Sequence, residues 1–302
     1  MNLYIYGKRT DLNETQVASL EEKYNKVAFI ETADFNPVFE DTSPKVIALD
    51  PDVVNWKFDN DTISKIQNLK AICLETTGFE WVDRDFCTSN NIVVTNVPHY
   101  ATNAVAEKCV FMALALAKKY PLFEQEGGMN WDKEFIGEDM FGKATDIVGF
   151  GAIGRALARK LTNIVGANEI CYYSHKKDDA NFHYMEFDEM LDKSEFMFVT
   201  ISNNPDSLAL FNDLSRFNPR TKVIIIANGF SEVAERMAKM VEEGKLGGVA
   251  FESNDLSKKY HGNVFVTPPN AYYTEGSLGK MFNIWTDTML SAAGEEIINR
   301  VN

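Results

Sequence analysis

The fold of this chain is decided by the stretch Ile147-Val-Gly-Phe-Gly-Ala-Ile-Gly-Arg-Ala-Leu-Ala158. It places the spacing Gly-x-Gly-x-x-Gly directly after an apolar β-branched run and at the start of a helical pattern. Gly149 permits a tight turn, Gly151 lets the backbone approach a pyrophosphate, and Gly154 allows close packing of helix on strand. Helix N-terminal amides hold phosphate charge, so the stretch predicts a dinucleotide-binding turn. The alternative is a strand-to-helix turn without a ligand.

Short β-branched or aromatic runs on both sides of this turn alternate with longer amphipathic stretches, a pattern typical of βαβ units around parallel sheets. One series of expected strands covers residues 144–148, 169–173, 196–201, 223–227, 248–251 and 264–266. An earlier series covers residues 3–6, 27–30, 46–50, 71–74 and 92–95, with helices at 14–24 and 62–67. The sequence therefore predicts an α/β protein with two doubly wound domains.

Three further segments stand out between and after these series. Residues 102–119 predict a long helix, capped by Thr102 or Asn103 and stopped by Pro121. Residues 122–142 show no clear period, and we expect a loop or arm there. Residues 274–299 predict a last helix.

Composition narrows the class of partner. The 302 residues carry 44 Asp and Glu against 30 Lys and Arg, a formal charge of −14, and no basic cluster. Nucleic acids and anionic membranes attract positively charged surfaces, so we expect neither as a partner. The longest apolar run, residues 109–117, is shorter than the ~20 residues of a membrane span, and Gly7 interrupts any leader, so we expect a cytoplasmic protein.

The cysteines and histidines indicate no metal site. Four cysteines occur without a Cys-x-x-Cys spacing, and we expect small buried apolar side chains. His183 and His261 fall in expected polar loops, and we expect neither to be a metal ligand.

The residues that end the expected strand at 169–173 indicate whether the cofactor is NAD or NADP. An NAD site usually places an acid there for the ribose 2′-hydroxyl, whereas an NADP site needs groups that tolerate a 2′-phosphate. Here Ser174, His175 and Lys176 follow the strand, and no acid comes before Asp178. This favours NADP, with NAD possible and a solvated turn as the alternative.

The sequence resembles the D-2-hydroxyacid dehydrogenases from about Leu69 to the end of the chain. The segments that carry the resemblance are residues 78–83, 92–98, 100–107, the glycine turn, 242–250 and 263–268. The resemblance implies a flavodoxin-like substrate domain of residues 1–97 plus 271–302 and an inserted Rossmann dinucleotide domain of residues 98–270. It also implies a homodimer built through the long helix and the arm, and a small substrate with a carboxylate.

Three catalytic side chains of that family are replaced. Asn228 stands where the resemblance places the arginine that binds the substrate, Ser257 where it places the glutamate, with Asp255 nearby, and Pro269 where it places the histidine. Asn228 still donates a hydrogen bond, but it neutralises no charge, and proline transfers no proton. The family's own reaction should therefore be nearly abolished unless other groups compensate.

Candidate site residues follow from the turn and the resemblance. The cofactor candidates are Gly149, Phe150, Gly151, Ala152, Ile153, Gly154, Ser174, His175, Lys176, Ile201, Ala227 and Glu252, where Glu252 replaces an aspartate that bonds the nicotinamide amide. The catalytic candidates are Asn228, Tyr100, His99 and Tyr272. Tyr100 matches a tyrosine that touches the substrate carboxylate in some lactate-type members. An exposed loop is the alternative for His99, and hinge packing for Tyr272.

Two functions remain open at this point. One is an NADP-dependent oxidoreductase that acts on a small carbonyl or hydroxy compound with an altered catalytic set. The other is a catalytically silent dinucleotide-binding protein that acts as a sensor or assembly partner. The glycine turn supports both, and the Thr76-Thr77-Gly78 turn, where family members hold the substrate carboxylate through backbone amides, favours the first.

Overall fold

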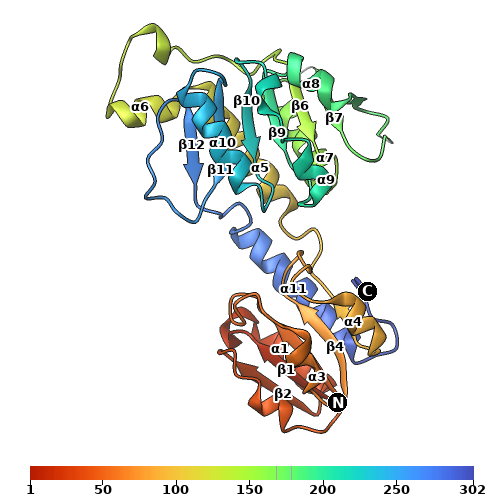
Figure 1. Ribbon diagram of the computed structural model, residues 1–302. Helices are drawn as coiled ribbons and strands as arrows, with labels where there is room; N and C mark the ends of the chain where they lie inside the picture. Colours follow the sequence, from red (N-terminus) through yellow and green to blue (C-terminus); the bar gives the residue numbers. More distant parts are fainter. Residues whose placement is uncertain (168, 178) are drawn as a thin grey trace. The chain divides into compact units, whose positions relative to one another are not determined.

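The computed structural model describes residues 1–167, 169–177 and 179–302, so Asp178 of the cofactor argument lies outside the described residues. The chain divides into two compact units, each an α/β layer structure (Figure 1). The first unit joins Met1–Ala101 to Thr274–Asn302, and the second, Thr102–Tyr273, is inserted between those segments. The expected division into two doubly wound units is confirmed at the level of fold class.

The first unit is a five-stranded parallel sheet in the order β2-β1-β3-β4-β5. Its strands are β1 (Asn2–Tyr6), β2 (Lys26–Ile30), β3 (Lys45–Leu49), β4 (Leu69–Leu74) and β5 (Val93–Thr95). Its helices are α1 (Glu14–Lys23), α2 (Asn36–Phe39), α3 (Asn60–Ser64), α4 (Arg84–Ser89) and α11 (Glu275–Ala292). This strand order is that of flavodoxin-like folds.

The pleat of this sheet separates two cores. Leu3, Ile5 and Cys73 pack with residues of α1 and α11 on one face. The alternate residues, such as Tyr4 and Leu74, pack on the other face. Successive side chains in a strand point to opposite faces. The pattern therefore determines to which face a residue directly after a strand end points.

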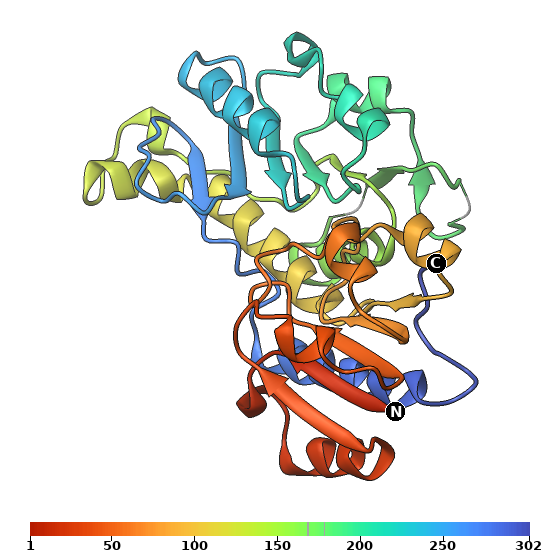
Figure 2. The same ribbon diagram turned by 60° about the horizontal axis from the view of Figure 1, so that its bottom comes forward.

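The second unit is a seven-stranded parallel sheet in the order β12-β11-β10-β9-β6-β7-β8. Its strands are β6 (Thr145–Val148), β7 (Ile170–Tyr173), β8 (His183–Tyr184), β9 (Phe196–Val199), β10 (Lys222–Ile225), β11 (Gly248–Glu252) and β12 (Val264–Thr267). Its helices are α5 (Thr102–Ala117), α6 (Tyr120–Glu126), α7 (Ala152–Lys160), α8 (Phe187–Lys193), α9 (Pro205–Ala209) and α10 (Ser231–Glu242). Figure 2 gives a second view of the same elements.

The strand order reverses at β6. From there the chain builds β7 and β8 on one side, and then returns to place β9 on the other. Ligands of open α/β sheets bind outside the carboxyl ends of the strands at such a switch point. The glycine turn directly follows β6 and therefore lies at this position.

Several local expectations were wrong. Pro121 does not end the long helix, because α5 already ends at Ala117 and Lys119 has φ of 55°. Pro121 instead lies in the first turn of α6, which extends into the expected arm. Asp59 caps α3 by accepting from the Thr62 amide, so that helix starts before residue 62. The last helix ends at Ala292, short of residue 299. His183 lies in the short strand β8, not in a loop.

The expected arm is also partly buried. Phe135 is buried and its ring lies 5.2 Å from that of half-buried Phe123. Met129, Trp131 and Phe141 stay exposed. In the part of the chain that the structure describes, no helix is both long and apolar enough to span a bilayer.

Candidate functional site

The three glycines of the turn after β6 have two different roles. Gly149 has φ of 99°, and a Cβ there would lie 2.6 Å from the amide nitrogen of Ile201. A Cβ on Gly154 would collide with the carbonyl oxygen of Gly149. A Cβ on Gly151, by contrast, would meet no atom within 4 Å. Gly149 and Gly154 therefore serve the turn itself, while the space at Gly151 is left open for a ligand.

The rest of the turn presents backbone to this space. Gly151 caps α7, and both Gly151 and Ala152 are exposed, with Ile153 half-buried. The Phe150 side chain is buried and stacks on Tyr172 at 4.2 Å between ring centroids, so only its backbone can meet a cofactor. Free amides at a helix N-terminus beside an open glycine fit the pyrophosphate of a dinucleotide.

Cationic side chains gather after β7. Ser174 is half-buried, while His175 and Lys176 are exposed. Lys177 is engaged elsewhere, with its Nζ 2.8 Å from Glu186 and 4.0 Å from the Tyr184 ring centroid. Ser174, His175 and Lys176 thus directly follow β7, the position at which dinucleotide folds meet the cofactor ribose.

The sequence argument missed Arg155. It lies in the first turn of α7, with its Nε 3.2 Å from Asp179 and its guanidinium 5.4 Å from the Phe150 ring centroid. The available signal was its position directly after the third glycine, which brings a cation to the same end of β6 and β7.

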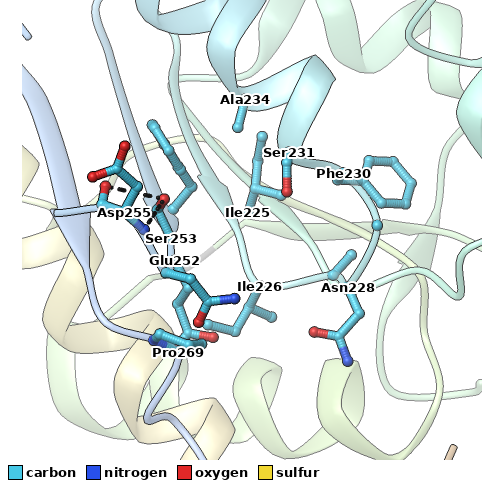
Figure 3. A pocket seen from close by; sticks show the side chains of 14 residues that line it. Ile225, Ile226, Asn228, Phe230, Ser231, Ala234, Glu252, Ser253, Asp255 and Pro269 are labelled. Atoms are coloured by element: carbon cyan, nitrogen blue, oxygen red, sulfur yellow. Dashed lines mark hydrogen bonds between the residues drawn. The ribbon is translucent and has the colours of Figure 1, made fainter. Parts of the chain in front are cut away.

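A pocket of about 440 Å³ lies at the carboxyl ends of β10, β11 and β12 (Figure 3). Its lining includes Asn228, Glu252, Asp255 and Pro269, with Pro269 and Asn228 on opposite sides. Ala227 also lines it. No Lys, Arg or His side chain is among the lining residues that the structure describes. The structure thus brings two of the three replaced family positions into one pocket without a cation.

Asp255 is among the residues that line this pocket, whereas Ser257 is not, and Figure 3 shows the exposed Asp255 carboxylate at the rim, pointing away from the interior. The Ser257 hydroxyl donates to the Asp255 carboxylate at 2.6 Å and the Ser257 amide donates at 2.9 Å. These bonds hold the pKa of Asp255 below its usual value. Asp255 therefore carries a negative charge at neutral pH.

Glu252 is the second carboxylate of the pocket. Its Oε1 accepts from the Ala271 amide at 3.0 Å. Burial raises the pKa of Glu252, while the Ala271 amide and the charge of Lys108 act in the opposite direction. Lys108 on α5 donates to Asn270 Oδ1 at 2.8 Å. Lys108 had no sequence signal, because a lysine on an amphipathic helix is usually solvated.

Of the other catalytic candidates, His99 and Tyr100 belong to the first unit and Tyr272 to the second. His99 is exposed and has φ of 60° in the first unit. Tyr100 packs against the core that α11 covers in that unit. Tyr272, in the second unit, is 38% exposed, and its ring meets that of Tyr273 at 6.0 Å. Within the described ranges, no group of three or more His, Cys, Asp or Glu is arranged to hold a metal ion.

Comparison with known proteins agrees with this geometry. The family model described as D-isomer specific 2-hydroxyacid dehydrogenase, catalytic domain, matches residues 9–302. A glyoxylate reductase of Pyrococcus furiosus is 26% identical over 230 residues, which cover 70% of this chain and 68% of that protein.

Two solved structures have the same fold. An acyclic imino acid reductase in complex with NADPH and D-Arg has a TM-score of 0.81 at 19% identity, with 100% of both chains covered. An NADPH-dependent glyoxylate/hydroxypyruvate reductase from Sinorhizobium meliloti, in complex with NADP and malonate, has a TM-score of 0.77 at 20% identity, covering 99% of this chain and 96% of that one.

Proposed function

Because this chain belongs to the D-isomer specific 2-hydroxyacid dehydrogenase family of NAD(P)-dependent oxidoreductases, we propose that it is a reductase with an altered catalytic set. It prefers NADP and takes a small substrate that carries a carboxylate. The first unit acts as the substrate domain and the second as the dinucleotide domain. The observation that carries this proposal is a pocket with two carboxylates and no lining cation, next to an intact glycine turn.

The residues present fit the cofactor. The open space at Gly151 and the exposed amides that begin α7 suit its pyrophosphate. Ser174, His175 and Lys176 suit a 2′-phosphate, and Glu252 suits the nicotinamide amide. When bound, the cofactor would supply a hydride to an electrophilic carbon of the substrate.

The pocket disfavours reduction of a simple carbonyl compound. Adding a hydride to a carbonyl carbon creates an oxyanion, which needs a nearby cation and then a proton. Asn228 offers at most a neutral hydrogen bond, and Pro269 offers no proton. Asp255 would repel the developing negative charge.

The same pocket favours a protonated carbon–nitrogen double bond. Such an iminium group is already positive and already carries its proton, so hydride addition removes a charge and needs no general acid. Glu252, with the ionised Asp255 at the rim of the pocket, would favour that positive charge. The structural neighbour described as an acyclic imino acid reductase indicates that this fold can host such a reaction.

The test is a panel of 2-oxo acids, pyruvate, glyoxylate and hydroxypyruvate, each supplied with NADPH alone and with added methylamine. We expect negligible oxidation of NADPH with the oxo acids alone and clear oxidation when the amine forms the imine. Turnover near the ~10 s⁻¹ median of natural enzymes with an oxo acid alone would overturn the altered catalytic set.

One variant and one further result distinguish a reductase from a protein that only binds the dinucleotide. Asp255→Asn should lower turnover with the amine at least tenfold while NADPH binding, measured by titration calorimetry, stays unchanged. NADPH binding without turnover in any mixture would contradict a reductase and support the silent dinucleotide-binding protein.

A further inference from the structure

The carboxyl edge of the sheet in the first unit carries a row of residues from three neighbouring strands. Gly7 directly follows β1, Asp50 follows β3 and Glu75 follows β4. The strand ladders pair Tyr6 with Leu49 and Leu49 with Leu74, so the next residues lie side by side. The Asp50 amide donates to the Tyr6 carbonyl at 2.8 Å, and the Glu75 amide donates to the Leu49 carbonyl at 2.9 Å.

The pleat directs this row to one face of the sheet. Ile5, Ala48 and Cys73, two residues earlier in each strand, all belong to the core that α1 and α11 cover. Because side chains alternate along a strand, Asp50 and Glu75 continue on that same face. A Cβ on Gly7 would lie 3.3 Å from Cη2 of Trp285 and 3.7 Å from Cβ of Asp50. The buried Trp285 ring therefore lies at the Gly7 end of the row, near Asp50.

Glu75 is the unusual member of the row. Its side chain is more than nine-tenths buried, and its Oε2 has no hydrogen-bond partner among the described residues. Burial, together with the charges of Asp50, Asp11 and Asp52, raises the pKa of Glu75 to about 9. Glu75 is therefore protonated at neutral pH without a ligand, and a cation bound beside it would favour its charged form. A buried acid whose oxygen lacks a hydrogen-bond partner is uncommon.

In the described part of the chain, no Lys, Arg or His forms an ion pair with Glu75 or with the three aspartates near it. Arg9, which is near in sequence, instead bonds Glu14 at 2.9 Å and the Leu12 carbonyl at 3.3 Å. Asp52 bonds the Trp56 indole at 3.0 Å. The acids also form no group that could hold a metal ion. The arrangement lacks a positive partner, and carboxylates beside an aromatic ring suit an organic cation.

We propose that this edge, Glu75 with Asp50 beside the edge of Trp285, binds the cationic nitrogen group of a small ligand, an ammonium or a guanidinium. Glu75 immediately precedes the Thr76-Thr77-Gly78 turn. If that turn holds a substrate carboxylate, which rests on the proposed function, one ligand with both a cationic nitrogen and a carboxylate meets both groups. The substrate class is then an amino or imino acid.

The test measures binding to the full chain without NADPH, so that it does not depend on turnover. The probes are both enantiomers of arginine and lysine, each compared with its neutral counterpart, citrulline or norleucine, by titration calorimetry. We expect a cationic probe to bind at least tenfold more tightly than its neutral counterpart. Glu75→Gln should weaken that binding at least tenfold, and Asp50→Asn should weaken it too.

Two control variants locate the effect. Glu31→Gln removes an exposed carboxylate that follows the outer strand β2, and it should leave binding unchanged. Glu22→Gln removes an exposed carboxylate of α1 and should also leave binding unchanged. Glu75→Gln should fold, since it removes a buried acid without changing its shape, and circular dichroism checks this.

Several results would overturn the inference: equal binding of the charged and neutral probes, no binding of any probe, or unchanged binding to Glu75→Gln. Binding of Mg²⁺ or Ca²⁺ in place of the organic cations would also overturn it. Failure of the proposed function shows separately, as loss of NADPH binding or turnover.

Discussion

Buried acids set the pH dependence of this protein at the scale of single residues. Asp146 in β6 is buried at 3% exposure, and its Oδ2 has no partner among the described residues. Burial raises its pKa to about 6, although Ser194 and Lys193 act in the opposite direction. A raised carboxyl pKa means that the folded state binds a proton more tightly than the unfolded chain does.

We predict that Asp146→Asn stabilises the protein at neutral pH but not in acid. Below about pH 4, the ordinary pKa of aspartate, both states are protonated and the variant should match the parent. Between there and the folded pKa of about 6 the parent loses stability as pH rises, up to about 3 kcal/mol in total. Urea unfolding at pH 4 and pH 7.5 measures the difference, and an equal gain at both values would contradict the assignment.

Cofactor choice is also argued at the scale of one residue. We predict that Lys176→Glu lowers the affinity for NADPH at least tenfold and leaves the affinity for NADH equal or higher, because a carboxylate repels the 2′-phosphate and accepts from a ribose hydroxyl. Lys177→Gln is the matched control, since Lys177 already pairs with Glu186. Titration calorimetry with both cofactors decides, and an unchanged NADPH to NADH ratio would remove the basis for an NADP site.

At the scale of elements, different glycines of the turn after β6 serve folding and cofactor binding. Gly149 faces the start of the loop after β9 with a positive φ, whereas Gly151 faces open space. Two substitutions of the same size therefore test two different roles. The comparison does not depend on knowing the substrate.

We predict that Gly149→Ala sharply lowers the melting temperature, because the new Cβ overlaps the Ile201 backbone and the positive φ is strained. Gly151→Ala should melt within a few degrees of the parent and bind NADPH at least tenfold more weakly, because its Cβ occupies the space for the pyrophosphate. Thermal unfolding and calorimetry measure the two effects. Normal NADPH binding by Gly151→Ala would mean that the opening serves no dinucleotide.

At the scale of the whole molecule, exposed apolar side chains are concentrated in one region. Among the residues that the structure describes, six of the twelve large exposed apolar ones fall between residues 111 and 141, and they are Phe111, Tyr120, Met129, Trp131, Ile136 and Phe141. Trp131 is 85% exposed. Soluble monomers rarely leave so much apolar surface in one region, which favours an interface between copies of the chain.

We predict a homodimer, with a mass by light scattering of about twice the 34.1 kDa of one chain. The double variant Trp131→Asp with Phe141→Asp should shift the mass towards one chain, because charges at an apolar interface are costly to bury. Leu256→Asp, an exposed apolar residue outside this region, is the control and should stay dimeric. A parent protein with the mass of one chain would refute the dimer.

The sequence alone determined the features that depend on neighbouring residues. The three glycines of the turn, the two series of short strands and the family all follow from local spacing and local turn chemistry. The same locality explains the errors, because Pro121 reads as a stop when the αL conformation of Lys119 is not known.

Only the tertiary structure decided which distant residues meet. Asp50 and Glu75 lie far apart in the chain, and the parallel register of β3 and β4 places them side by side. Asp255 lines the pocket and Ser257 does not, since the hydroxyl of Ser257 bonds back to Asp255 within one loop. Lys108 acts on Glu252 because α5 packs on the sheet near the end of β11. Local sequence carries no record of register or packing, so the charges that surround a buried group were set by the fold.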